Sequence, residues 1–287
     1  MTDTGAPVLR LDDAELRFGD RVVWHHLSLA AEAGEFIAVL GPNGTGKTSL
    51  LKVLLGQNRL HAGTARVNGH LARAGDDDIG YIPQQRGLDG STPMRGRDLV
   101  RMGLDGHRWG PGLFSRKRRE RVDELLEAVG AQEYANAPAG LLSGGELQRL
   151  RVAQALVGEP SLLLCDEPLL SLDMNHQKRV AALIDEMRRT RGTAVLFVTH
   201  EINPILPYVD RVLYLAGGHY KVGTPEEVIT SESLTELFGS PIEVVEVGDR
   251  LVIVGGDDHP HHLEPEPAGT DGLGLLSGPG AASRAAI

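Results

Sequence analysis

The 287-residue chain is long enough to bury a hydrophobic core as one large domain or two small ones. Its composition, 41% hydrophobic and 24% charged, is typical of a soluble globular protein. The formal net charge of −10 argues against a nucleic-acid binder that relies on a general basic surface. No apolar run approaches the roughly 20 residues of a membrane span, and we expect no secretory signal at MTDTGAPVLRLDD.

The single cysteine, Cys165, excludes an internal disulfide and fits a reducing cytosol. It lies in the apolar run SLLLCDEP, which predicts a buried strand. We therefore interpret Cys165 as a small apolar filler and not as a nucleophile.

Short apolar runs and turn residues divide the chain into predicted elements. Residues 8–30, broken by FGDR, predict antiparallel strands joined by a turn. EFIAVL predicts a strand that leads into a glycine-rich loop, and TSLLKVLLGQ predicts a helix that stops at Gly56. Further strands are predicted at 64–68, 79–82, 161–166, 193–199 and 211–218, with a helix in HQKRVAALIDEMRRT and a closing hairpin at 244–255.

The segment from about 91 to 158 is rich in helical patterns and separates the two groups of strands. The order of elements predicts an α/β fold with a parallel-sheet core, an antiparallel β subdomain and a helical insertion. We assign residues 1–254 to one domain. Residues 255–287 are rich in Gly, Pro, Ala and acids and poor in large apolar side chains, so we expect a disordered tail.

The glycine-rich loop matches G-x-x-x-x-G-K-[ST] at every fixed position. Its residues are Gly41, Pro42, Asn43, Gly44, Thr45, Gly46, Lys47 and Thr48. Glycines let backbone N–H groups turn toward a phosphate at a helix start, where the helix dipole adds to the attraction. We expect Lys47 to reach the β- and γ-phosphates and the Thr48 hydroxyl to bind Mg²⁺.

Three further polar positions follow predicted strands. Asp166 ends SLLLCD, where it could hold Mg²⁺, and Glu167 comes next, where it could polarise a water molecule. His200 ends TAVLFVTH and Gln84 follows IGYIP, so an imidazole and an amide could also reach the phosphate, metal or water. Alone, each has a plainer interpretation, such as an acid pair at a helix start or an exposed polar residue.

A second phosphate-type turn, Ser143-Gly144-Gly145, lies about 100 residues from the first, at the start of a predicted helix. Taken together, the motifs of residues 8–255 resemble the ATP-binding subunit of ABC transporters. The resemblance implies an ABC-type P-loop NTPase fold, ATP and Mg²⁺ as ligands, and a nucleotide site that extends to Ser49. It makes Asp166 the Walker B acid, Glu167 the catalytic glutamate, Gln84 the Q-loop residue and His200 the switch histidine.

The same resemblance gives roles to the remaining positions. LSGGE matches the family signature, with Glu146 where Gln is commoner, and Asp173 matches the acid of the D-loop. Phe18 aligns with the aromatic residue that stacks on adenine, usually Tyr. The family pairs two copies around two ATP molecules, so Ser143 to Glu146 would serve the ATP of the partner. This explains two phosphate-binding turns that need not meet within one chain.

Three stretches resemble the ATPases of zinc and manganese importers: VRMGLDGHRWG, HEINPILPYVDRVLYLAGG and GTPEEVITSESLTELFGSPIEVVEV. The resemblance implies a membrane permease partner, indirectly an extracytoplasmic metal-binding protein, and a peripheral location on the cytoplasmic face of the membrane. ATPases of iron-siderophore or cobalamin importers are the alternative. A soluble non-transport ABC ATPase is disfavoured because the chain has one ATPase unit, no heptad run and one cysteine, and a degenerate non-hydrolysing module because the catalytic positions are intact.

Two charged clusters have plain interpretations. His259, His261 and His262 are expected to be solvated in the tail, although three imidazoles could bind Zn²⁺ weakly. The basic run Arg116 to Arg119 begins a predicted helix that continues with acids, so we expect a solvated helix face and no nucleic-acid contact.

Overall fold

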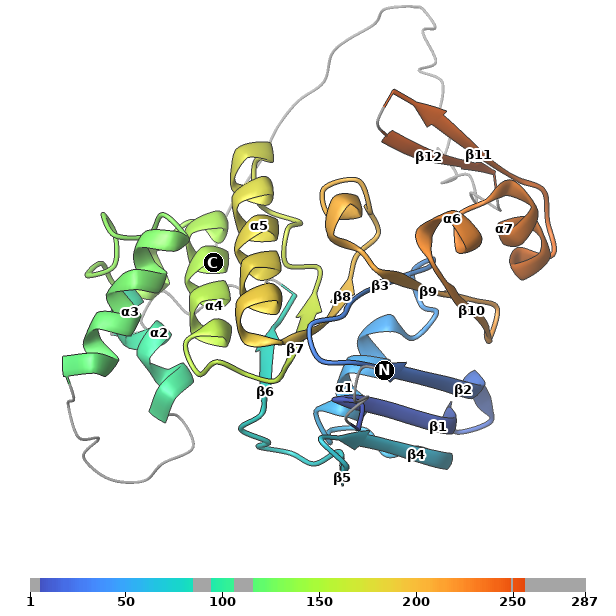
Figure 1. Cartoon of the computed structure of the whole chain (residues 1–287), viewed down its shortest axis with the longest axis horizontal. Coiled ribbons are helices and arrows are strands. Elements are labelled where there is room, and N and C mark those ends of the chain that lie inside the picture. Colours follow the sequence, from blue (N-terminus) through green and yellow to red (C-terminus); the bar gives the residue numbers. More distant parts are fainter. Residues whose placement is uncertain (1–5, 85–93, 106–115, 249, 256–287) are drawn as a thin grey trace, which may run out of the picture. The chain divides into compact units, whose positions relative to one another are not determined.

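The computed structural model describes residues 6–84, 94–105, 116–248 and 250–255. Its elements follow the predicted order, with paired strands first, then a strand–loop–helix, a helical segment and a return to alternating strands and helices (Figure 1). Three predicted features lie wholly or partly outside the described residues: the start of the helical insertion at 91–93, residues 106–110 of the stretch VRMGLDGHRWG, and the tail from 256 onward with its three histidines.

A six-stranded sheet forms the centre, in the order β10-β9-β3-β8-β7-β6. Its strands are β3 (Phe36–Leu40), β6 (Ile79–Ile82), β7 (Leu162–Asp166), β8 (Ala194–Val198), β9 (Arg211–Ala216) and β10 (His219–Gly223). Every neighbouring pair is parallel except β9 and β10, which form an antiparallel hairpin at the edge. Parallel strands end at the same edge of a sheet, so the residues that follow β3, β6, β7 and β8 are brought to one edge.

The predicted antiparallel subdomain is a second sheet in the order β2-β1-β4-β5. Its strands are β1 (Leu9–Phe18), β2 (Arg21–Ala31), β4 (Ala62–Val67) and β5 (His70–Leu71). The turn between β1 and β2 is the FGDR segment, so the predicted turn is confirmed and places Phe18 at a strand end.

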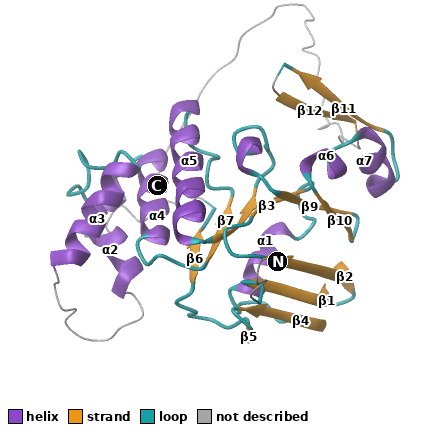
Figure 2. Cartoon of the chain, viewed as in Figure 1, coloured by secondary structure: helices purple, strands orange, loops and turns teal. Residues whose placement is uncertain are grey.

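The helices are α1 (Lys47–Leu54), α2 (Gly96–Asp105), α3 (Arg116–Ala128), α4 (Gly144–Leu156), α5 (Met174–Arg191), α6 (Pro225–Val228) and α7 (Ser231–Phe238). Short 3₁₀ turns lie at Ala139–Leu141 and Leu206–Tyr208. The insertion packs as a group, because α2, α3 and α4 contact one another, and α4 also contacts α5 of the core (Figure 2). Arg116 begins α3 and pairs with Glu120 one turn later, while Lys117 and Arg119 are exposed, so the basic run is a solvated face as predicted.

Side chains along the central strands point alternately to the two faces of the sheet, so the hydrophobic core is divided into two clusters. On β3, Ile37 and Val39 pack in the cluster shared with α1 and the antiparallel sheet, whereas Phe36 and Ala38 pack with the insertion helices and α5. Fully buried strands of this kind read as continuous apolar runs, which is how the sequence predicted them. Cys165 is completely buried in β7, and burial raises its pKa well above the ordinary thiol value, so its prediction as an apolar filler is confirmed.

The predicted closing hairpin is formed by β11 (Ile242–Val247) and β12 (Arg250–Gly255). The Asn203 side chain fixes this hairpin with two hydrogen bonds: its Nδ2 donates to the Leu251 carbonyl at 3.0 Å and its Oδ1 accepts from the Leu251 N–H at 2.9 Å. The hairpin is therefore attached to the loop that follows β8, three residues beyond His200. No helix among the described residues is both long and apolar enough to cross a bilayer.

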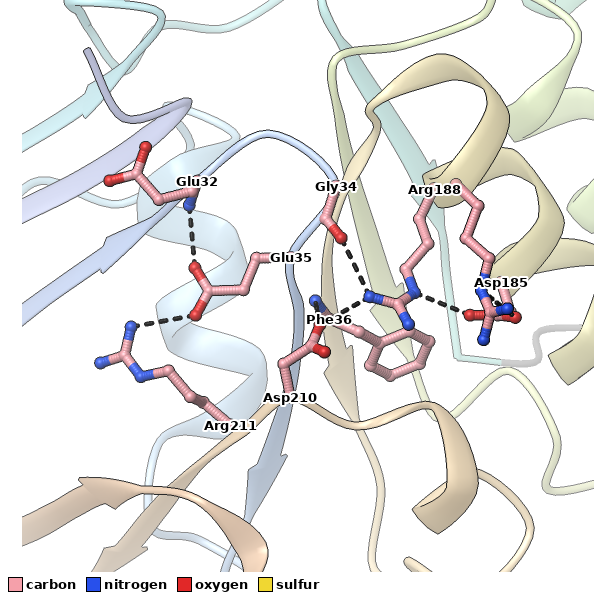
Figure 3. A network of polar contacts seen from close by, with 9 residues as sticks. Glu32, Gly34, Glu35, Phe36, Asp185, Arg188, Asp210 and Arg211 are labelled. Carbon is pink, nitrogen blue, oxygen red and sulfur yellow. Dashed lines mark hydrogen bonds and ion pairs between the residues drawn. The ribbon is translucent and has the colours of Figure 1, made fainter. Parts of the chain in front are cut away.

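A polar network ties the start of β3 to the end of α5 and the start of β9 (Figure 3). The Arg188 guanidinium donates to the carboxylates of Asp185 (2.7 Å) and Asp210 (2.6 Å) and to the Gly34 carbonyl (3.0 Å). The same Asp210 oxygen accepts the backbone N–H of Phe36 at 2.8 Å. Asp210 thus satisfies both a nearly buried cation and the first donor of β3.

Replacing Asp210 by Ala is expected to lower the free energy of unfolding by about 1–2 kcal/mol, because Arg188 and the Phe36 N–H each lose an acceptor while Asp210 itself is partly exposed. Urea denaturation measures this change. The matched control is Asp12→Ala, which removes a carboxylate of similar exposure from a surface pair with Arg10. Equal effects of the two substitutions would show that the network stabilises the fold no more than an ordinary surface ion pair does.

Candidate functional site

The glycine-rich loop connects the end of β3 to the start of α1, as predicted. Gly41, Gly44 and Gly46 all have positive φ angles, of 137°, 80° and 93°. A Cβ at Gly41 would lie 2.1 Å from the Leu215 carbonyl oxygen, and one at Gly46 would lie 2.3 Å from a methyl carbon of Val23. Both the backbone conformation and the close packing therefore require glycine at these positions.

Lys47 begins α1 and its side chain folds back over the loop. Its Nζ donates to the carbonyls of Gly41 at 2.6 Å and Pro42 at 2.9 Å. Burial lowers the pKa of Lys47, and the carboxylates of Glu167 and Asp166 oppose that shift. The ammonium group is thus held at the mouth of the loop, where it can face the phosphates of a nucleotide.

Thr48 and Asp166 meet across the site although 118 positions separate them. The Thr48 Oγ1 donates to the Asp166 Oδ1 at 3.0 Å. Asp166 ends β7 and is 2% exposed; burial raises its pKa, and the hydrogen bond from Thr48 opposes the rise. A hydroxyl and a carboxylate side by side are oxygen donors of the kind that Mg²⁺ prefers, so these two residues fit that ion.

Glu167 lies between Gln84 and His200. The Gln84 Nε2 donates to one carboxylate oxygen at 3.1 Å, and the His200 Nδ1 lies 3.5 Å from the other. Glu167 has a φ of 49°, and its N–H donates to the Val198 carbonyl. A left-handed conformation outside glycine costs energy and recurs at functional sites, so the backbone here aims a carboxylate into the site.

His200 lies two residues beyond the end of β8, not at the strand end as predicted. A local loop fixes the chain around it: the Thr199 Oγ1 donates to the Glu201 carbonyl at 2.9 Å and accepts from the Glu201 N–H at 3.0 Å. A small cavity beside this loop is lined by Glu167, Leu169, Leu170, Gln177, Thr199, His200, Glu201 and Pro204. His200 therefore reaches Glu167 from a short constrained turn.

A larger pocket of about 350 Å³ lies over the glycine-rich loop. Its lining consists of Phe18, Arg21, Val23, Asn43, Gly44, Gly46, Lys47, Thr48, Ser49, Gln84 and Glu167. Phe18 is 52% exposed at this rim, and an exposed aromatic ring offers a face for stacking a base. The structure thus brings residues of the antiparallel sheet to the same pocket as the residues at the carboxyl ends of the central strands.

Arg21 is a site residue that the sequence reasoning missed. It follows the turn after Phe18, lines the pocket, and its Nη2 lies 3.3 Å from the Gly44 carbonyl. A guanidinium at this place is suited to phosphate oxygens. The only sequence signal was its position in FGDR beside the predicted adenine-stacking residue.

The second phosphate-type turn caps α4 and does not line this pocket. Ser143 is the N-cap of the helix and forms a capping box with Glu146. The Glu146 carboxylate accepts from the Ser143 N–H at 2.8 Å and from its hydroxyl at 2.7 Å, and these bonds lower the pKa of Glu146. An anion that approached Ser143 would have to displace the carboxylate of Glu146.

Asp173 is the N-cap of α5. Its Oδ1 accepts from the backbone N–H groups of Asn175 and His176, and its Oδ2 lies 2.5 Å from the His176 Nδ1. Hydrogen bonds from His176 lower the pKa of Asp173. Like Ser143, Asp173 is absent from the lining of the pocket over the glycine-rich loop.

The fold and the glycine-rich loop define a P-loop nucleotide-binding protein. A family model described as ABC transporter matches residues 24–170. The zinc import ATP-binding protein ZnuC of Roseobacter denitrificans is 33% identical, covering 80% of this chain and 84% of its own. The manganese transport system ATP-binding protein MntB of Halalkalibacterium halodurans is 30% identical, covering 86% and 98%.

Two solved structures extend the comparison. One is an inward-facing conformation of a transporter assigned to the metal-chelate type, with 26% identity, a TM-score of 0.71, and coverage of 86% of this chain and 96% of the other. The second is a dimeric ATP-binding cassette in a post-hydrolysis state with ADP and Pi, with 25% identity, a TM-score of 0.65, and coverage of 75% and 98%. The chain belongs to the ABC transporter family, as an ATP-binding protein that hydrolyses ATP.

Proposed function

We propose that this ATPase powers an ABC importer for a divalent metal ion, zinc or manganese. The observation that supports the catalytic part is the convergence of Lys47, Asp166 and Glu167 on one sheet edge above a glycine-rich loop. The cargo is inferred from the two relatives named for zinc import and manganese transport. The metal would be moved by a separate membrane permease and would not pass through this chain.

The proposed reaction is attack of water on the γ-phosphate, which breaks the bond to the oxygen that bridges it to the β-phosphate and releases ADP and phosphate, with the proton of the water passing to Glu167. Glu167 orients and polarises the water, Lys47 stabilises negative charge on the phosphate oxygens, and His200 and Gln84 hold the carboxylate of Glu167 in place. Phe18 stacks on adenine, and the backbone from Gly41 to Ser49 surrounds the phosphates. Thr48, Asp166 and Gln84 would hold Mg²⁺, which neutralises phosphate charge when bound.

The proposed assembly is a dimer of this chain with ATP between the copies. Ser143, Gly144, Gly145 and Glu146 line no part of the pocket over the glycine-rich loop, nor does Asp173, so these residues are available to the ATP of a second copy. Release of phosphate removes the bridge between the copies and lets them separate. The solved dimeric cassette with ADP and Pi supports this arrangement by similarity.

The proposed partners and location of the chain follow from its role as the ATPase of an importer. The chain would bind the cytoplasmic face of an integral permease, near Gln84 and the segment from 91 to 110, and would act indirectly with an extracytoplasmic metal-binding protein. We assign the activity to a domain that covers residues 1–254. No nucleic-acid partner is proposed.

A metal chelate, such as an iron-siderophore or cobalamin, is the second candidate cargo. The structural relative assigned to the metal-chelate type supports it. Both candidates use the same ATPase chemistry and differ in the permease.

Cargo is tested by uptake in cells with and without this gene. We expect loss of zinc or manganese uptake, restored by the wild-type chain and not by Glu167→Gln. Loss of chelate uptake alone would favour the second candidate. Unchanged uptake of every cargo, with no permease co-purifying from membranes, would contradict an importer and favour a soluble ABC ATPase.

A further inference from the structure

His176 joins the N-terminal cap of α5 to helix α4, two elements that the proposed dimer presents to the partner. It lies in the first turn of α5, outside both pockets of the site. Its Nδ1 lies 2.5 Å from the Asp173 Oδ2, and its Nε2 lies 2.5 Å from Nη1 of Arg149 on α4. One imidazole therefore bridges the cap of α5 and the helix that Ser143 begins.

The two residues that contact the imidazole determine which of its ring nitrogens accepts a hydrogen bond and which donates one. Arginine can only donate, so the His176 Nε2 accepts and the proton lies on Nδ1, from which it is donated to Asp173.

Arg149 is itself held from two sides. Its Nη1 donates to the Gly130 carbonyl at 3.3 Å, and its guanidinium carbon lies 5.2 Å from the centre of the Tyr134 ring. The other charged groups near this contact are Glu146, which shares α4, and Arg179, whose guanidinium lies against Gly130. The Arg149 guanidinium is thus a fixed donor for His176.

A second contact joins the same two elements. A Cβ at Gly145 would lie 3.2 Å from the Ser171 carbonyl oxygen and 3.7 Å from the Leu172 side chain. The first turn of α4 therefore packs on the residues just before Asp173. Together with the chain of hydrogen bonds from Arg149 through His176, this contact aligns the Ser143 turn and the Asp173 cap.

We propose that His176 is a positioning residue that holds the Asp173 cap in register with the Ser143 turn, so that both meet the ATP of a second copy as one surface. The inference rests on the proposed dimer. Its ligand is the bound nucleotide of the partner chain, and His176 acts on it only through Asp173 and Arg149.

The test uses three substitutions in the full chain. His176→Leu removes both hydrogen bonds. His176→Gln keeps them, because its amide oxygen can accept from Arg149 while its NH₂ donates to Asp173. His61→Leu, at an exposed position before β4, is the matched control.

We expect His176→Leu to lower kcat by roughly tenfold or more, because two hydrogen bonds to charged groups are lost, with ATP affinity of the single chain unchanged. His176→Gln should stay within about twofold of wild type at pH 7.5.

Turnover of His176→Leu within twofold of wild type would overturn the proposal, as would a His176→Gln variant as impaired as His176→Leu. ATP-driven dimerisation is then measured in the Glu167→Gln background. A Glu167→Gln parent that stays monomeric with bound ATP refutes the proposed dimer itself. If Glu167→Gln dimerises with ATP, but the double variant Glu167→Gln/His176→Leu dimerises equally well, only the role of His176 is refuted.

Discussion

Replacing Glu167 by Gln is expected to reduce ATP turnover by about 10²–10⁴-fold, the range for loss of a general base. The amide keeps the size and the hydrogen-bonding capacity that Gln84 and His200 face, but it cannot take a proton from water. ATP binding should be retained or become tighter, because a negative charge beside the phosphates is removed. Steady-state turnover and equilibrium binding of a fluorescent ATP analogue measure the two effects separately.

The control for this substitution is Glu201→Gln. Glu201 lines the same small cavity as Glu167, but its hydrogen bonds to Thr199 are made by its backbone N–H and carbonyl. We expect Glu201→Gln to turn over within about twofold of wild type. Substantial turnover by Glu167→Gln, or an equal loss in both variants, would refute Glu167 as the general base.

Ser143→Arg is expected to abolish ATP-driven dimerisation and turnover while leaving ATP binding to the single chain nearly intact. ATP binding by the single chain is kept because Ser143 caps α4 and is absent from the pocket that Lys47 and Thr48 line. An arginine there fills the space in which the turn would meet a phosphate of the partner. Binding of the ATP analogue at low protein concentration and sedimentation at high concentration separate the two properties.

Loss of a helix cap must be distinguished from loss of the contact. Thr230 caps α7 in the same way, since its side chain accepts from the Ser233 N–H. Thr230→Arg removes a comparable cap, of about 1 kcal/mol, and should leave dimerisation unchanged. If both variants fail to dimerise, or if Ser143→Arg alone loses single-chain ATP binding, Ser143 does not act on a partner.

The chemistry at the strand ends could be predicted because it follows from local sequence. Buried parallel strands are short apolar runs, and Asp166 and Glu167 come at the end of one such run. The topology then places them beside the loop after β3, and the motif spacing supplied Lys47 and Thr48. The same logic gave the antiparallel subdomain and the closing hairpin.

Other features could not be predicted because they depend on contacts between distant segments. Arg21 reaches the Gly44 carbonyl only because the antiparallel sheet is placed beside the loop. The positive φ of Glu167 has no signature in a residue that usually avoids that conformation. The edge strand β10 and the helices α6 and α7 are short, and the sequence HYKVG has no strong period. The bridge through His176 joins positions 27 residues apart on two helices.

The mass of the Glu167→Gln chain in solution with saturating ATP and Mg²⁺ tests the central claim most directly. Light scattering should give about twice the 30.8 kDa of one chain with ATP, and the single-chain mass with ADP. Adding Ser143→Arg to the same chain should return the single-chain mass with ATP still bound. A single-chain mass for Glu167→Gln at saturating ATP would contradict an ATPase that works as a nucleotide-bridged pair.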